Sequence, residues 1–145
     1  MTQEKTAGST VLGRLLMTVA TLTYGVAPPL VDFGETHLLH PSWPGHARFH
    51  LMWLVLSHSA IAVIALCSLW LSAGRRWGID LAGGIGLSVL GSFMLSAALM
   101  PFYAGALSDP GGVPLLGPVD ANVVAFGFAL ILLAVGWFQA RRKAI

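Results

Sequence analysis

Four long apolar runs dominate this sequence, and each is long enough to cross a lipid bilayer. They cover approximately residues 11–30, 49–73, 79–103 and 119–140. A helix rises about 1.5 Å per residue, so about 20 apolar residues span a hydrocarbon core about 30 Å thick. Apolar residues make up 56% of the chain and charged residues only 10%, unlike a soluble domain. The sequence therefore predicts an all-α fold, in which residues 1–145 form a single integral membrane domain, a bundle of four transmembrane helices.

The distribution of positive charge predicts the orientation of this bundle, because Lys and Arg beside membrane helices tend to remain cytoplasmic. One side carries Lys5, Arg14, Arg75, Arg76, Arg141, Arg142 and Lys143, and the other carries Arg48 alone. We therefore expect both termini in the cytoplasm, in an inner membrane of bacterial type. The loop between the first two runs, which is rich in histidine, then lies outside. These anchors account for the net charge of +2, so the charge gives no reason to expect nucleic acid as a partner.

Local signals predict where the helices begin and end. Pro28-Pro29 is expected to end the first run, because proline lacks the amide donor, and Pro44 suits the first turn of the second. Asp80 can cap the start of the third run, and Asp109-Pro-Gly-Gly predicts a turn before the fourth. Arg14 lies about one turn inside the first run, where its side chain can extend back to the cytoplasmic headgroups.

Cys67 is the only cysteine, and this excludes several kinds of site. A single thiol cannot form an internal disulfide, and a Cys-based zinc or iron–sulfur site is not expected. The chain lacks Cys-x-x-Cys-His, so haem cannot be attached covalently in the c-type manner. No stretch resembles a nucleophilic triad or a phosphate-binding glycine loop.

The second apolar run contains two histidines and is preceded closely by a third. On a helix, His46 and His50 are one turn apart on the same face, Ser57 lies almost directly below His50, and His58 is rotated from it by about 80°. These three histidines can therefore face one shared region. His50 is expected a few Å below the outer boundary, with His58 about 12 Å deeper. An ionisable residue at that depth usually has a function. A neutral His58 imidazole bonded to a neighbouring helix is the alternative.

The outer loop carries four further potential metal ligands, Asp32, Glu35, His37 and His40. Carboxylates and imidazoles at such spacing can bind a transition metal. No His-x-x-x-His or comparable signature joins the four, and a solvated loop whose acids cap helix ends is the favoured interpretation. Whether His37, His40 and His46 bind a second metal is left open by the sequence.

The topology of four crossings brings polar residues from distant segments to one outer layer. These are His46, His50, Tyr103, Asp120 and Asn122. Apolar walls lie below them, formed by Phe49, Met52, Trp53 and Leu54. An imidazole among aromatic side chains and few charges suits a b-type haem. Two members have simpler explanations, because Tyr103 can be an interfacial anchor and Asp120 can complement the positive end of the last helix.

Short motifs along nearly the whole chain match a known family. They are Leu-Thr-Tyr24-Gly25-Val in the first run, Trp43-Pro-Gly-His-Ala-Arg-Phe-His50 leading into the second, Phe102-Tyr103 ending the third and Gly117-Pro118-Val-Asp120 opening the fourth. In these motifs the chain resembles the styrene oxide isomerases, small four-helix membrane enzymes that assemble as trimers with ferric haem b at the subunit interfaces. The resemblance implies a homotrimer, a haem b cofactor and a small hydrophobic epoxide as substrate.

The resemblance also implies roles for individual residues. His50 matches the axial haem ligand, and Tyr103 matches a tyrosine that positions the substrate. Phe49, Trp53 and Asp120 are then expected near the haem. In that family the ferric iron acts as a Lewis acid, and the epoxide rearranges to an aldehyde without an external oxidant or reductant. Such chemistry requires one protein ligand, one vacant iron position and a dry pocket.

Two positions depart from the family pattern. The family has an asparagine six residues after the haem histidine, where this chain has Leu56, and an aspartate eight residues before the tyrosine, where it has Leu95. Ser57, His58 and Ser96 are adjacent and can replace the lost polarity if the register shifts. His58 is therefore a further candidate for a catalytic role, or it can occupy the open face of the haem.

Two other classes of function fit the same residues. One is a haem or gas sensor, or an electron-transfer subunit, with His58 or a histidine from a neighbouring protomer as sixth ligand. The other is a binding or scaffold protein without a cofactor, whose outer histidines bind a metal ion or sense pH. In the latter, a seam of small residues in the third run would serve assembly. The seam consists of Gly84, Ser88, Ser92 and Ser96.

Overall fold

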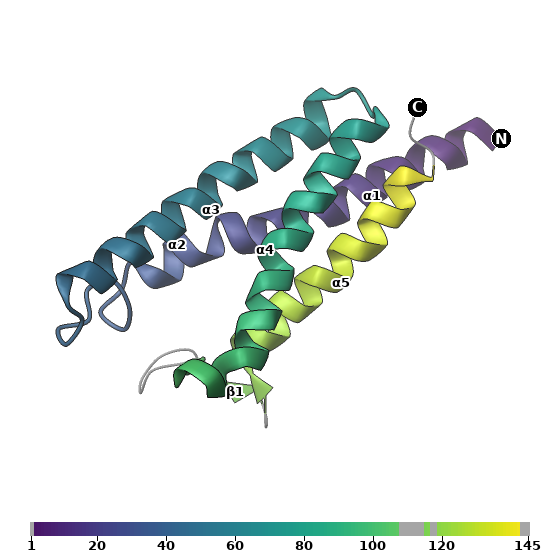
Figure 1. The fold of residues 1–145 in the computed structure, drawn as a ribbon. Coiled ribbons are helices and arrows are strands. Elements are labelled where there is room, and N and C mark those ends of the chain that lie inside the picture. The colour runs from purple at the N-terminus through teal and green to yellow at the C-terminus, as the bar shows by residue number, and fades with distance from the viewer. Residues whose placement is uncertain (1, 108–114, 117–118, 143–145) are drawn as a thin grey trace.

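The computed structural model describes residues 2–107, 115–116 and 119–142, and these are mostly helical. The elements are α1 (Thr2–Gly25), α2 (Ala27–Asp32), α3 (Gly45–Leu71), α4 (Arg76–Tyr103), β1 (Leu115–Leu116), β2 (Val119–Asp120) and α5 (Ala121–Arg141) (Figure 1). Within the described residues, four helical segments are long and apolar enough to cross a membrane: Val11–Asp32, Gly45–Leu71, Arg76–Tyr103 and Ala121–Arg141. The prediction of an all-α bundle with four membrane-spanning helices is therefore confirmed.

The connection before α5 differs from the prediction that a helix begins at residue 119. Leu115 pairs with Asp120 and Leu116 with Val119 in a short antiparallel ladder, and α5 begins only at Ala121. The expected turn at residues 109–112, the Gly117-Pro118 pair and Lys143 lie outside the described residues, as does the side chain of Lys5.

Pro28-Pro29 does not end the first membrane segment, as the sequence suggested, but opens the short helix α2 after a break at Val26. Proline is tolerated in the first turn of a helix, where amide donors have no intrahelical acceptor. Pro29 lacks the N–H that would reach the carbonyl of Gly25 four residues earlier. The Ser59 hydroxyl of α3 donates to that carbonyl at 2.9 Å instead. The break is thus compensated from a neighbouring helix, as a membrane interior requires.

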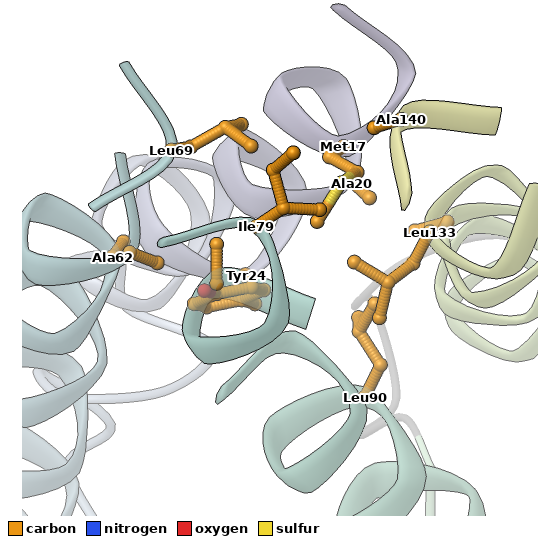
Figure 2. Packing of buried hydrophobic residues seen from close by; sticks show 12 residues of the cluster. Met17, Ala20, Tyr24, Ala62, Leu69, Ile79, Leu90, Leu133 and Ala140 are labelled. Atoms are coloured by element: carbon orange, nitrogen blue, oxygen red, sulfur yellow. The ribbon is translucent and has the colours of Figure 1, made fainter. Parts of the chain in front are cut away.

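Helices α1 and α5 pack in close contact through two glycines. A Cβ atom added to Gly13 would lie 2.6 Å from the Ala140 nitrogen and 2.7 Å from the Gly136 oxygen, and one added to Gly136 would lie 2.6 Å from the Gly13 oxygen. Such approach needs residues without side chains. Around this contact, all four long helices contribute to one core, with Met17, Ala20 and Tyr24 from α1, Ala62 and Leu69 from α3, Ile79 and Leu90 from α4, and Leu133 and Ala140 from α5 (Figure 2).

Helix α4 packs on α5 through a different stripe of small residues from the one singled out in the sequence. Gly83 lies against the Trp137 ring and Gly86 against Leu133. A Cβ added to Gly84 would contact nothing within 4 Å, and Ser88 is exposed, as are Ser92 and Ser96. The predicted seam therefore lies on the outer surface of the single chain.

Asp80 joins α4 to α5 and does not cap α4, because the helix already begins at Arg76. Its carboxylate accepts a hydrogen bond from Trp137 Nε1 at 2.8 Å. The same group pairs with Arg141 Nε at 2.9 Å and with Arg76 Nε at 3.7 Å. The carboxylate is therefore satisfied by a hydrogen bond from Trp137 and by ion pairs with two arginines.

The C-terminal end of α3 is attached to α1. The Arg14 guanidinium, expected to extend to the headgroups, donates to the Leu69 carbonyl at 2.8 Å and lies 4.3 Å from the centre of the Trp70 ring. Trp70 Nε1 in turn donates to the Thr18 hydroxyl at 2.9 Å. The arginine thus satisfies carbonyls that the end of a helix leaves without partners.

The N-terminal half of α3, here called its outer half, follows the loop of residues 33–44 and leaves the bundle. Figure 1 shows α3 and α4 diverging from the turn that joins them, and among the described residues α3 makes no contact with α5. Phe49 and Trp53 are accordingly 61% and 60% exposed. The start of α1, the α3–α4 turn and the end of α5 lie together at the other end of the molecule.

The glycine contact predicts a sharp difference between two substitutions on α5. Gly136→Ala should lower the free energy of unfolding by about 1–3 kcal/mol, because the added methyl overpacks the α1 contact. Gly127→Ala is the matched control, since a Cβ there meets nothing within 4 Å. Thermal unfolding of the detergent-solubilised variants measures both, and equal unfolding temperatures would contradict the close contact.

Candidate functional site

The candidate site is an open groove along the outer half of α3. Its volume is about 720 Å³, a size typical of ligand pockets. Its polar side chains are His50, Ser57 and His58, and the remaining lining is apolar, from Trp43, Ala47, Leu51, Trp53, Leu54 and Ile61. Of the three histidines expected to face one shared region, His50 and His58 line the groove with Ser57, and His46 does not.

Helical periodicity explains the lining of the groove. Ala47, Leu54, Ser57 and Ile61 lie three residues before and four, seven and eleven residues after His50, which are the spacings of one helix face. Leu54 and Ser57 were expected near His50 from the sequence. Ala47 and Ile61 were not, although extending the same spacing from His50 would have found both. Trp43 entered the prediction only as part of the motif that leads into the second run.

His46 and His50 form the closest contact between potential ligands. Their Nε2 atoms are 3.0 Å apart, and the rings stand at 89° with centroids 4.4 Å apart. Both side chains are exposed. His46 does not line the groove, so in this arrangement the His50 Nε2 faces His46.

The two aromatic residues expected around His50 lie close to it. Phe49 and Trp53 have ring centroids 5.8 and 6.2 Å from that of His50, and 6.3 Å from each other. Only Trp53 lines the groove. Together they place aromatic surface beside the His50 imidazole.

His58 lies deeper along the groove and is half-buried. Its ring makes no hydrogen bond to any side chain or backbone group that the structure describes. The expected alternative, a structural hydrogen bond to a neighbouring helix, is therefore absent among the described residues. The neighbouring departure from the family pattern, Leu56, is 58% exposed, and Leu95 on α4 is 60% exposed.

The remaining residues of the predicted outer layer lie elsewhere in the single chain. Tyr103 ends α4, is 57% exposed, and its hydroxyl donates to the Ser96 carbonyl at 2.9 Å. Asp120 is the N-cap of α5 and accepts from the Asn122 backbone N–H at 2.8 Å, while the Asn122 side chain donates to the Leu107 carbonyl at 3.3 Å. Because α3 and α4 diverge, the end of α4 and the start of α5, which carry these residues, lie far from the start of α3 (Figure 1).

Histidines of the outer loop are bonded within the loop itself. His37 Nδ1 lies 2.9 Å from the Thr36 hydroxyl, and its Nε2 lies 4.0 Å from Asp32. His40 Nδ1 lies 2.8 Å from the Ser42 hydroxyl. In the part of the chain that the structure describes, no three His, Cys, Asp or Glu side chains are grouped to hold a metal ion.

Comparison with known proteins identifies a family but no activity. The model of a family of unknown function (DUF6640) matches residues 16–144. No curated protein and no solved structure matches the chain. The match includes all of α3 and therefore the whole groove.

Proposed function

Because the chain belongs to the DUF6640 family, whose function is unknown, we propose from its own residues that it is a membrane protein that binds haem b in the α3 groove through His50. The observation that carries the proposal is the groove itself. It places one accessible imidazole beside an apolar surface of ligand-pocket size in a membrane-spanning helix. Haem b needs both an axial ligand and apolar walls for the macrocycle.

The residues of the groove fit such a group. Trp43, Trp53 and Leu54 offer broad apolar contacts, and no carboxylate lines the groove. His50 must turn its Nε2 from His46 into the groove, which its exposed position allows. When bound through one imidazole, ferric haem supplies a Lewis acid with an open coordination position.

We propose isomerisation of a small hydrophobic epoxide as the reaction. The apolar walls would exclude water from the reacting molecule. Tyr103 of the same chain is too far away to position it, so this role falls to Tyr103 of the partner subunit in a homo-oligomer, a trimer by resemblance. The open side of the groove and the outward-facing Gly84–Ser96 seam support such an assembly. A monomeric mass for the haem-loaded detergent complex would contradict it.

The structure supports one second candidate, a haem sensor or electron-transfer protein. His58 lines the same groove as His50 and is not committed to another described group. It, or a histidine of another protomer, would then be a sixth ligand. A six-coordinate low-spin spectrum supports this candidate, and a five-coordinate high-spin ferric spectrum supports the isomerase.

Purified protein from cells supplied with haem should show a Soret band. His50→Ala should abolish the band, because it removes the axial nitrogen. His40→Ala is the matched control and should keep it, since that imidazole is bonded to Ser42 in the loop. A colourless wild-type protein, or a band unchanged in His50→Ala, would overturn haem binding at this site.

The haem-loaded protein should convert a small aryl epoxide to the aldehyde without added oxidant or reductant. Tyr103→Phe should lower kcat at least about tenfold, because a lost positioning contact typically costs up to about 100-fold. Phe102→Leu, at the neighbouring exposed position, should leave kcat unchanged. Product analysis by gas chromatography measures both. Equal turnover by the His50→Ala protein would show that the reaction does not use this site.

We propose that both termini face the cytoplasm of an inner membrane of bacterial type, with the outer loop on the opposite side. The charge distribution supports this, since Arg75, Arg76 and Arg141 lie at the end of the molecule shared by both termini. In a Cys67→Ala background, Ser42→Cys should react with a membrane-impermeant maleimide in intact cells. A cysteine added after Ile145 should react only after lysis, and the reverse pattern would invert the topology.

A further inference from the structure

We infer that His46 and His50 form a binding site for a divalent transition metal ion of the copper or nickel class at the outer end of α3. The two residues are four apart on one helix, a spacing that places two imidazoles on the same side of a metal ion in known helical sites. Their Nε2 atoms already converge to 3.0 Å. This site goes beyond the proposed haem function and does not depend on it.

The distance between the two nitrogens matches that of adjacent ligands on one ion. With metal–nitrogen bonds of about 2.0–2.1 Å, two nitrogens at a right angle are about 2.9 Å apart, and at the tetrahedral angle about 3.3 Å. The observed 3.0 Å is closest to the right angle. Square-planar and tetragonal nitrogen sites are typical of Cu(II) and Ni(II).

Packing does not explain why the two imidazoles meet. Both side chains are exposed, and neither belongs to the buried core. An N–H···N hydrogen bond between two neutral rings accounts for the distance in the absence of an ion. That bond already holds the two Nε2 atoms side by side. For both to bind a metal, the donor ring would move its proton from Nε2 to Nδ1, so that each Nε2 offers a lone pair to the ion.

The charges around the pair select the kind of ion. Arg48 is close in sequence, but its guanidinium donates to the His40 carbonyl at 2.8 Å. The N-terminal end of α3 adds partial positive charge, and no carboxylate groups with the pair among the described residues. Electrostatic attraction is therefore weak, and binding must come from the bonds between metal and imidazole. Ca²⁺ and Mg²⁺, which prefer oxygen ligands, are excluded.

Metal binding at this pair and haem binding by His50 exclude each other. One Nε2 atom cannot bind two metals, and His46 does not line the groove. His46 is consequently needed only for binding the ion, and His58 only for binding haem in the groove. His50 is needed for both. These separate dependences allow the two proposals to fail independently.

The test is titration of purified full-length protein, without a histidine tag or haem, with CuSO4 followed by calorimetry and electron paramagnetic resonance. We expect one Cu(II) per chain with a tetragonal spectrum that shows coupling to nitrogen. His46→Gln and His50→Gln should each weaken binding at least tenfold. His40→Gln and His58→Gln should leave it unchanged, and CaCl2 should give no heat.

Cu(II) binding that is unchanged in His46→Gln, or weakened equally by His40→Gln, would overturn the site. His46→Gln protein supplied with haem separates the two proposals. If it keeps the Soret band and loses Cu(II) binding, both stand. If the wild-type protein binds Cu(II) through the pair but shows no Soret band, the haem proposal fails and the metal site remains.

Discussion

The close contact of α1 with α5 is the constraint on which the rest of the structure depends. At Gly13 and Gly136 each backbone occupies the space that a side chain on the other would need. In a membrane, helices gain little from burying apolar surface, because lipid is equally apolar, so close backbone packing is a main source of association. Helix α4 then packs on α5 through Gly83 and Gly86, and α3 attaches both to α1 and, near the turn that joins them, to α4.

Polar bonds inside the bundle have a related role, because no water is available to satisfy them. The Ser59 hydroxyl satisfies the Gly25 carbonyl that Pro29 leaves free. Asp80 accepts from Trp137 and Arg141. Most of these contacts lie between the break at Val26 and the end of the molecule at which α1 starts and α5 ends. None of those just named involves the outer half of α3, which therefore diverges from α4 and leaves its groove open.

The divergence of α3 changes how its histidines should be understood. His50 belongs to two arrangements, since it lines an apolar groove and its Nε2 meets His46. Either arrangement uses one imidazole with a free nitrogen at the outer end of a membrane helix. In the homo-oligomer proposed above, a second copy would cover the groove and supply Tyr103 to the haem arrangement, whereas in the single chain His50 meets His46.

Periodicity in the sequence determined much of this protein. The apolar runs predicted the four membrane segments, because the length of a span follows from the geometry of one helix. Of the three histidines expected to face one region, His50 and His58 share the groove with Ser57, and His46 lies outside it. Helix ends were less predictable. Pro28-Pro29 is typical of a helix end, but a hydroxyl from another helix satisfies the carbonyl that the prolines leave free. Asp80 is typical of a helix cap, but α4 already begins at Arg76.

Only the tertiary structure decided which faces meet. Gly83 and Gly84 are neighbours in the sequence, yet the first packs on Trp137 and the second lies open, since adjacent residues on a helix point about 100° apart. The expected outer layer likewise divided into a group around His50 and another around Tyr103 and Asp120. Local spacing specifies which residues share a helix face, but the angle between helices depends on contacts between segments far apart in the chain, and these decide which faces form a site.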